Sequence, residues 1–244
     1  MGISIRPTGL ENAAAALRYW ERRQEVLANN LANVNTAGFK GEHTFAHLLS
    51  DGATPVIDSA TDLTPGPIVP TGAPFDVAIE KDGFFVIQTP LAEKLSRGGE
   101  WHVNERHVLV DQSGNPVLGE DDAAGGTRGH IIIPAEAKQI DIDRAGAVKV
   151  DGTQIARLRV ESVSAGIKLQ HEGAGLFAVP DKRASMTATQ RSIRQGATEE
   201  SNVSSISSMV DMISVQRAYA SVQKVMTTIN SARSTAATEI GKPV

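Results

Sequence analysis

Apolar residues near the beginning of the chain recur in steps of three and four positions. They are Leu10, Ala13, Leu17, Trp20, Gln24, Leu27, Leu31 and Val34, of which only Gln24 is polar. This spacing places all of them on one face of a helix and is typical of a coiled-coil seam. Thr8 and Glu11 fit a capping box, in which a hydroxyl and a carboxylate satisfy free amide groups at a helix start. We therefore predict a helix from about Gly9 to Asn33.

Two apolar stripes run along the C-terminal segment, offset by one position. The first consists of Val203, Ile206, Val210 and Ile213, and the second of Met212, Val215, Tyr219, Val222, Met226 and Ile229. Glu199 and Glu200 precede a candidate N-cap at Ser201 or Asn202, where negative charge suits the positive end of a helix dipole. We predict a helix that continues to about Thr238. Its two apolar stripes imply more than one neighbour.

Residues 68–195 have a different hydrophobic pattern, in which short apolar runs are separated by turn-forming residues. Residues Phe75–Gln88 are typical of two strands joined by a tight turn at Lys81–Gly83. Further turns are predicted at Ser113–Asn115, Asp143–Gly146 and Asp151–Gly152, and another hairpin within residues 167–180. This regular spacing favours an antiparallel β domain, either a sandwich or an irregular barrel. No β-α-β alternation indicates a parallel sheet.

The segment between these zones, residues 41–67, is less regular. "GEHTFAHLLS" is compatible with a short extension of the helix, and "DGATPVIDSATDLTPGP" is rich in turn formers, so we expect it to be irregular. The predicted fold is therefore α+β, with long terminal helices pairing as a coiled coil around a central, mainly antiparallel β domain. Its predicted divisions are an N-terminal helix (1–40), a connecting segment (41–67), a β-rich domain (68–195) and a C-terminal helix (196–244).

Two interpretations of the terminal helices are open from the pattern. Each apolar stripe is compatible with the core-facing side of an ordinary amphipathic helix. The alternative is that the two helices meet and form a stalk or an assembly element, because the β zone between them needs neither helix to explain it. The pattern favours the second interpretation.

Composition and charge exclude several classes of protein. The 244 residues include no cysteine, which excludes disulfides and thiolate chemistry, and a formal net charge of -4 without a basic stripe argues against nucleic acid. The longest apolar run of the N-terminus, Ala13–Leu17, is too short for a signal peptide. No segment approaches the roughly 20 apolar residues that cross a bilayer. We expect no direct membrane insertion, and export, if any, without a cleaved signal.

Candidate chemistry is sparse. His43 and His47 would share one face of a helix, but a metal site needs a third ligand, and surface polar residues are the better interpretation. Asp141, Asp143 and Gly146 lack the spacing of a calcium loop and fit an ordinary strand and turn. The glycine pairs form no phosphate-binding loop, and no serine, histidine and acid stand out as a set. We expect no catalytic, cofactor-binding or metal-binding residues.

Three ordered motifs resemble those of the bacterial flagellar axial proteins, the family of rod, hook and hook-associated subunits. They are "ANNLANVNTAGFK", "TPGPIVPTGAPFDVAIEKDGFFVIQ" and "QGATEESNVSSISSMVDMISVQRAYASVQKVM", and together they span nearly the whole chain. Compact length and the "TPG" lead-in look most like a proximal rod subunit, with a distal rod subunit as the alternative. The family's usual Tyr-Thr-Arg-x-Gly-x-Phe segment is replaced here by Trp101–Asp111. A coiled-coil adaptor outside the flagellum, with a β-rich binding domain, is the other alternative.

The resemblance implies a structural subunit with no catalysis and no cofactor. Its terminal helices would line the inner tube of the rod, and its β domain would form the outer shell. Implied partners are copies of itself, other rod subunits and, during secretion, the flagellar type III export apparatus. The implied location is the basal body, in the periplasmic rod that joins the motor to the hook.

The expected assembly interface gathers the apolar positions of both helices and several polar ones. It consists of Leu10, Leu17, Trp20, Leu27, Asn29, Asn30, Leu31, Asn33, Val34, Asn202, Val203, Ile206, Val210, Ile213, Arg217, Tyr219, Val222, Met226 and Ile229. Asn29, Asn30 and Asn33 are expected to pair between helices or subunits, whereas Asn35 and Gly38 belong to the exit turn. The alternative is that the amides cap an exposed helix end. Arg217 either binds carbonyls or carboxylates of a neighbour or is simply solvated.

Overall fold

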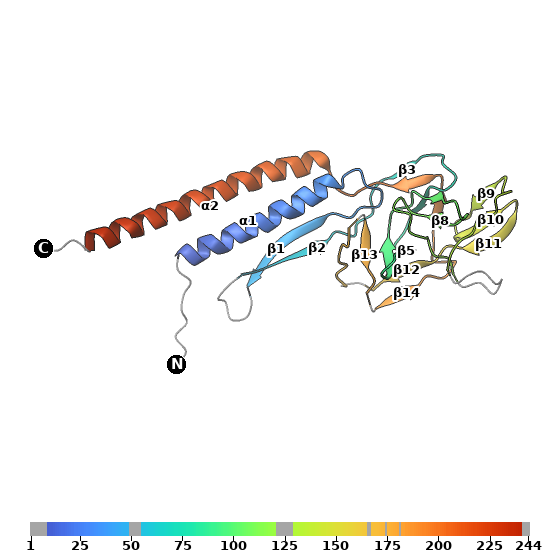
Figure 1. Ribbon diagram of the computed structural model, residues 1–244, viewed down its shortest axis with the longest axis horizontal. Coiled ribbons are helices and arrows are strands. Elements are labelled where there is room, and N and C mark those ends of the chain that lie inside the picture. Colours follow the sequence, from blue (N-terminus) through green and yellow to red (C-terminus); the bar gives the residue numbers. More distant parts are fainter. Residues whose placement is uncertain are drawn as a thin grey trace. The chain divides into compact units, whose positions relative to one another are not determined.

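The structure is a computed structural model that describes residues 9–48, 55–120, 129–164, 167–173, 175–180 and 182–240 (Figure 1). It has two compact units built from interleaved segments. The described residues of the first unit, the helical unit, fall within Met1–Ala32, Glu42–Ala60 and Ser204–Val244. Those of the second, the β unit, fall within Asn33–Gly41 and Thr61–Val203. The predicted α+β class with a central antiparallel region is confirmed.

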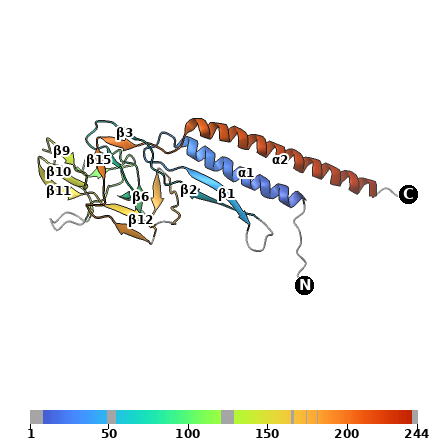
Figure 2. The ribbon, with the colours of Figure 1, turned by 180° about the vertical axis from the view of Figure 1, so that it is seen from behind.

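The helical unit is built around two long helices, α1 (Gly9–Ala32) and α2 (Ser205–Ile240). Both views of the ribbon show them side by side (Figures 1 and 2). Gly9, at the start of α1, lies close to Ile229 of α2, while Tyr219 meets Glu21, so the two helices run antiparallel. The predicted bounds of α1 are confirmed to within a residue, but Thr8 of the predicted capping box lies outside the described residues.

The start of α2 differs from the prediction of an N-cap at Ser201 or Asn202. The helix begins at Ser205, and Ser204 caps it, because its Oγ accepts a hydrogen bond from the amide of Ser207 at 3.4 Å. The Ser204 carbonyl accepts the first helical bond, from the amide of Ser208 at 2.9 Å. Asn202 is unable to serve as the cap because its side chain is bonded elsewhere, to the chain around Gly41.

The prediction of helix or irregular structure in residues 41–67 is wrong over most of the segment. Residues Glu42–Leu48 form strand β1, and Pro55–Thr61 form strand β2, which pairs with it in a two-stranded sheet. Strand β1 packs on α1. A strand is favoured here because the side chain of Asn30 binds both backbone groups of Glu42, which a helical Glu42 would need for its own turns.

The β unit contains fourteen short strands among its described residues. They are β3 (Ile68–Pro70), β4 (Val77–Ile79), β5 (Phe84–Gln88), β6 (Glu93–Ser96), β7 (His102–Val103), β8 (Leu109–Val110), β9 (Ile140–Ile142), β10 (Ala147–Val150), β11 (Thr153–Arg157), β12 (Val160–Val163), β13 (Leu176–Ala178), β14 (Arg183–Ser185), β15 (Ile193–Gln195) and β16 (Ala197–Glu199). The largest sheet has the order β13-β6-β5-β12-β14. Strands β11, β10 and β9 form a second sheet, and the others pair two by two.

Strand β5 lies at the centre of the five-stranded sheet and is buried on both faces. Phe85 and Ile87 belong to the larger core, which also holds Trp101, while Phe84 and Val86 belong to a smaller core around Phe177. Successive side chains of a strand point to opposite faces. This is why "FFVI" is an unbroken apolar run rather than an alternating one.

Most predicted turns of the β unit are confirmed. Strands β9 and β10 pair across Asp143–Gly146, and β10 and β11 pair across Asp151–Gly152. Bridges also close the hairpins around Ser113–Asn115 and within residues 167–180. The predicted Phe75–Gln88 hairpin is wrong. Its two strands do not pair with each other, because β4 pairs with β15 while β5 pairs with β6 and β12.

Candidate assembly interface

The two apolar stripes of α2 have different surroundings. Residues of the second stripe lie toward α1: Val215 is 1 % exposed, and Met212, Tyr219, Val222, Met226 and Ile229 are half-buried. The first stripe is open: Ile206 is 76 % exposed, Val210 57 % and Ile213 51 %. Met209 lies on the same face and is 52 % exposed. Val203, the first member of the stripe, precedes the helix and is half-buried. The outer face of α2 (Ile206, Met209, Val210 and Ile213) is therefore an apolar surface that no described residue covers.

The predicted seam of α1 is half-buried except at Ala13. Its members Leu10, Leu17, Trp20, Leu27 and Leu31 are all partly exposed. The fully buried residues of α1 are Ala13, Ala15, Val26 and Asn30, of which only Ala13 belongs to the seam. The helix therefore has a second buried face, because it packs on both α2 and β1. Sequence periodicity missed this face because Ala15 is small and Asn30 is polar, so they carry little apolar signal.

Asn30 has an intramolecular partner. Its Nδ2 donates to the carbonyl of Glu42 at 2.8 Å, and its Oδ1 accepts from the amide of Glu42 at 2.9 Å. The side chain amide therefore pairs with a β1 backbone edge in the way that another strand would. Asn29 is exposed on the same helix. Asn30 was expected at an interface between helices or subunits. In the structure it joins α1 to β1 within the helical unit.

The chain leaves α1 through a tight turn that begins the β unit. The amide of Thr36 donates to the carbonyl of Asn33 at 3.1 Å, and the hydroxyl of Thr36 donates to Asn33 Oδ1 at 3.2 Å. Val34 is half-buried and Asn35 exposed. Gly38 has a φ of 68°, the left-handed region that glycine adopts most readily. The prediction that Asn35 and Gly38 belong to the exit turn is confirmed, and Asn33 belongs to it too.

Asn202 binds two other segments of the β unit. Its Oδ1 accepts from the amide of Gly41 at 2.8 Å, and its Nδ2 donates to the carbonyls of Asp62 at 2.9 Å and Thr64 at 3.1 Å. Three chain segments that are far apart in sequence thus meet at one side chain. The sequence pattern gave no reason to place Asn202 there, because these are contacts between non-local backbone groups.

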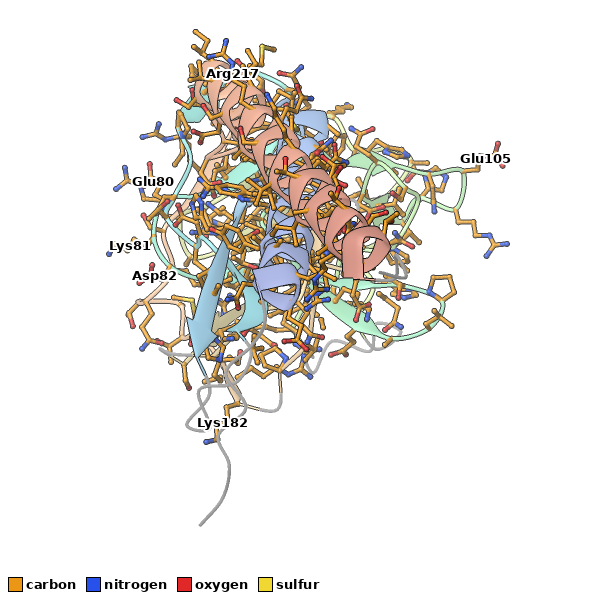
Figure 3. All side chains as sticks on the ribbon, turned by 90° about the vertical axis from the view of Figure 1, so that its left-hand side faces the viewer. Glu80, Lys81, Asp82, Glu105, Lys182 and Arg217 are labelled. Atoms are coloured by element: carbon orange, nitrogen blue, oxygen red, sulfur yellow. The ribbon has the colours of Figure 1, made fainter. Side chains whose placement is uncertain are left out.

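Arg217 and Tyr219 lie on different sides of α2. Figure 3 shows the side chain of Arg217 at the periphery of α2, away from α1, and among the described residues it has no polar partner. Tyr219 instead donates to Glu21 of α1 at 3.0 Å. Arg217 therefore adds a cation to the exposed surface beside Ile213.

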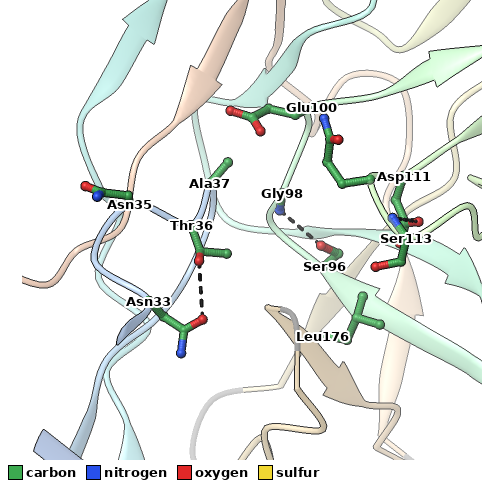
Figure 4. A pocket seen from close by; sticks show the side chains of 11 residues that line it. Asn33, Asn35, Thr36, Ala37, Ser96, Gly98, Glu100, Asp111, Ser113 and Leu176 are labelled. Atoms are coloured by element: carbon green, nitrogen blue, oxygen red, sulfur yellow. Dashed lines mark hydrogen bonds between the residues drawn. The ribbon is translucent and has the colours of Figure 1, made fainter. Parts of the chain in front are cut away.

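A cavity of about 450 Å³ opens beside the exit turn in the β unit (Figure 4). Asn33, Asn35, Thr36 and Ala37 form one wall. The remaining lining residues are Ser96, Gly98, Glu100, Asp111, Gln112, Ser113 and Leu176. Asp111 is held by the amides of Ser113 and Asn115, at 2.9 and 2.8 Å, and shapes a turn. The cavity therefore has hydrogen-bonding groups on both of its walls.

The segment Trp101–Asp111 forms a short hairpin of β7 and β8. Trp101 is buried and packs edge-on against Phe85, with ring centroids 4.7 Å apart. Asn104 Oδ1 accepts from the amides of Arg106 and Val108, which closes the turn. This sequence therefore supplies both a core aromatic and its own turn chemistry.

Potential metal ligands do not gather in the part of the chain that the structure describes. His43 and His47 lie on strand β1, not on a helix, and both are exposed beside Phe45. Asp143 accepts the amides of Ala145 and Ala147, each at 3.0 Å, and so organises the β9–β10 turn. In the described ranges, neither helix has the length and hydropathy of a membrane span.

These features define a class of protein in which terminal helices pair in one unit, expose an apolar face and enclose a β-rich segment in sequence. Comparison with known families agrees with this class. Residues 10–40 match the family described as flagella basal body rod protein, residues 78–150 the flagellar hook protein FlgE/F/G D1 domain, and residues 194–239 the flagellar basal body rod FlgEFG protein C-terminal region.

Individual relatives show the same family over most of the chain. The flagellar basal-body rod protein FlgF of Caulobacter vibrioides is 33% identical, with 91% of this chain and 93% of the relative covered. FlgF of Rhizobium meliloti is 30% identical (90% and 92% covered), and FlgG of Agrobacterium fabrum is 29% identical (88% and 93% covered). The chain belongs to the flagellar basal-body rod protein family. It is a structural component of the bacterial flagellum that serves motility.

Proposed function

We propose that this chain is a proximal rod subunit of the FlgF type, which polymerises through its terminal helices into the tubular shaft between motor and hook. The observation that carries this proposal is the exposed outer face of α2. Ile206, Val210 and Ile213 repeat at intervals of four and three residues and lie more than half open to solvent. Burying such a side chain contributes roughly 1.5–3 kcal/mol. A neighbouring subunit that covers this face would gain that energy.

The second stripe of α2 and the outer face of α2 have different roles in this proposal. The residues of the second stripe (Met212, Val215, Tyr219, Val222, Met226 and Ile229) lie toward α1, so they are engaged within one subunit. In this proposal α1 and α2 pair as a coiled coil, and the outer face remains for heterologous contacts, in which one surface meets a different surface of the next copy. Arg217 lies beside that face and would bind a carboxylate or carbonyl of the neighbour. Asn29 and Asn33 are proposed to take part in contacts between subunits.

FlgF is preferred to FlgG because two of the FlgF relatives are somewhat more similar than the FlgG relative. The identities are 33% and 30% for the two FlgF proteins, and 29% for the FlgG protein.

The proposed partners are copies of this chain, other rod subunits and the type III export apparatus. The proposed location is the periplasmic part of the basal body, and the proposed role requires no catalysis and no cofactor.

Assembly is tested by placing a charge on the outer face of α2. We expect Ile213→Asp to abolish polymer formation by the purified chain and its binding to rod proteins, measured by sedimentation and electron microscopy. Ser207→Asp is the matched control, because it adds the same charge at an exposed polar position of α2. Both variants should keep the helical content of the parent. Polymers formed equally well by Ile213→Asp would show that this face is not the interface.

The choice between FlgF and FlgG is tested by complementation. The chain is expressed in a motile bacterium that lacks its own FlgF and in one that lacks its own FlgG. We expect swimming to return in the first strain only. Recovery in the second strain alone would identify the chain as a distal rod subunit.

A further inference from the structure

A buried cluster of charges joins three segments of the β unit. The side chains of Lys40 and Glu199 are both fully buried, and Lys40 Nζ lies 2.5 Å from Glu199 Oε1. The two residues are 159 positions apart in the sequence. Lys40 belongs to the segment that follows α1, and Glu199 to the segment that precedes α2. The sequence did not predict that these two side chains form a pair.

Backbone groups of these two segments and of a third segment, Thr64–Gly66, complete this contact. Lys40 Nζ also donates to the carbonyl of Thr64 at 2.7 Å, and Glu199 Oε1 also accepts from the amide of Gly66 at 2.9 Å. The carbonyl of Glu199 accepts from the amide of Gly38 at 2.6 Å. The "TAGFK", "TPG" and "ATEE" parts of the three flagellar motifs therefore converge on one site.

Arg97 adds a second cation to the cluster. It is 2 % exposed, and its Nε lies 3.6 Å from Glu199 Oε2. Its guanidinium also donates to the carbonyls of Lys81 at 2.8 Å and Ile79 at 3.3 Å. Asp62 and Asp82 attract Lys40 and Arg97, respectively, more weakly than Glu199 does. Two buried cations thus share one buried carboxylate.

Burial lowers the pKa of Lys40 below its ordinary value, although the hydrogen bond that Lys40 donates to Glu199 acts in the opposite direction. Burial likewise lowers the pKa of Arg97, against the attraction of Glu199. Both directions agree with the geometry, in which one carboxylate serves two desolvated cations. Removing one partner of a buried ion pair leaves an uncompensated charge, which is strongly destabilising.

We propose that Lys40, Arg97 and Glu199, the neck lock, fasten the segment after α1 to the segment before α2, and that both cations depend on Glu199. The lock closes only when chain segments from both ends of the sequence are in place. It is a conformational device of the single subunit and does not rest on the proposed assembly.

The cluster has two cations and one central carboxylate. Substitution of the carboxylate should therefore cost more stability than substitution of Lys40. Loss of Glu199 leaves two buried cations with only the weaker attraction of Asp62 and Asp82, whereas loss of Lys40 leaves the neutral pair of Arg97 and Glu199. After Lys40→Met, Glu199 Oε1 still accepts from Gly66, and the carbonyl of Thr64 still accepts from Asn202. Lys40→Met should therefore be mild. Added to Glu199→Gln, it should restore stability, because it removes one of two unpaired cations.

The test is thermal unfolding of the full chain in a double-mutant cycle, with limited trypsin digestion as a second measurement. We expect Glu199→Gln to lower Tm by about 10 °C and Lys40→Met by less than about 4 °C. The double variant should melt at least about 3 °C above Glu199→Gln. Trypsin should cut after Lys40 in Glu199→Gln but not in the parent, where Lys40 is fully buried.

The matched control is Glu25→Gln, which removes the carboxylate of the exposed Arg22–Glu25 pair. It should change Tm by less than about 2 °C and leave Lys40 protected. Equal losses from Lys40→Met and Glu199→Gln, or a further loss in the double variant, would overturn the proposal. If Glu199→Gln fails to fold, a folded double variant supports the lock, and an unfolded double variant overturns it.

Discussion

The hydroxyl of Tyr219 lies 3.0 Å from Oε1 of Glu21 and donates a hydrogen bond to it. This contact joins α2 to α1 across 198 positions of sequence and marks the antiparallel register of the two helices. The carboxylate accepts from the protonated phenol, and this hydrogen bond is the main cause that raises the pKa of Tyr219 above its ordinary value. The interaction is therefore a spectroscopic reporter of helix pairing.

The first prediction uses that reporter. The chain has two tyrosines, so an ultraviolet titration of the parent minus that of Tyr219→Phe isolates Tyr219. We expect this component to titrate above about pH 10 while the helices are paired. Because the folded pKa is raised, the contribution to stability is fully present below the unfolded pKa and is lost as pH rises through the folded value. A component that titrates at or below pH 10 would show that the pairing differs.

Asn30 provides a second prediction, on stability. Asn30→Ala removes two hydrogen bonds and leaves the backbone groups of Glu42 without these partners, so we expect unfolding free energy to fall by about 2–4 kcal/mol. Denaturant unfolding measures the loss. Asn12→Ala, at an exposed position of the same helix, is the control and should change stability by less than about 0.5 kcal/mol. Comparable effects of the two changes would contradict the role assigned to Asn30.

Gly38 supports a third prediction because it needs both its conformation and its lack of a side chain. A Cβ at Gly38 would lie 2.2 Å from the carbonyl carbon of Arg97. The φ of Gly38 is 68°. Gly38→Ala should therefore cost about 3 kcal/mol or more. Gly72 has a φ of 75° but nothing within 4 Å, so Gly72→Ala should cost only about 1 kcal/mol. Calorimetric melting of the two variants separates close packing from backbone strain.

The fourth prediction concerns acid. Burial by itself raises the pKa of Asp143, but hydrogen bonds from the amides of Ala147 and Ala145, together with Lys149, outweigh it, so the pKa lies below its ordinary value. Such a carboxylate stabilises the fold above its unfolded pKa of about 3.9, and this contribution is lost as pH falls through the folded value.

Asp143→Asn should therefore cost about 1 kcal/mol or less at neutral pH, because Asp143 and Lys149 are each about one-third exposed. The difference from the parent should shrink as pH falls below about 4. Unfolding in denaturant between pH 2.5 and 7 measures it. Lys149→Met should move the acid transition of the parent to higher pH. A difference that stays constant across this range would contradict the assignment.

Much of the β unit was predictable because turns are local. Asp143 and Gly146 lie within one turn, so their sequence specifies that turn and the pairing of β9 with β10. The partners of β4 and β5 were not predictable, since β4 pairs with β15 more than 100 positions away, and β5 pairs both with β6, fewer than 15 positions away, and with β12, more than 70 positions away. The chain bends at Lys81 and Asp82 without forming the predicted hairpin turn, because strand pairing also depends on distant strands that compete for the same edges.

The sequence by itself determined the two terminal helices, the antiparallel class of the middle and the resemblance to the flagellar rod family. Helical periodicity is a local property, and it also distinguished the two stripes of α2. Only the tertiary structure decided which stripe meets α1 and which stays open, because a stripe does not name its partner. It alone brought Lys40, Arg97 and Glu199 together. Their attraction acts over a few ångströms, and only the folded chain brings residues 159 positions apart to that distance.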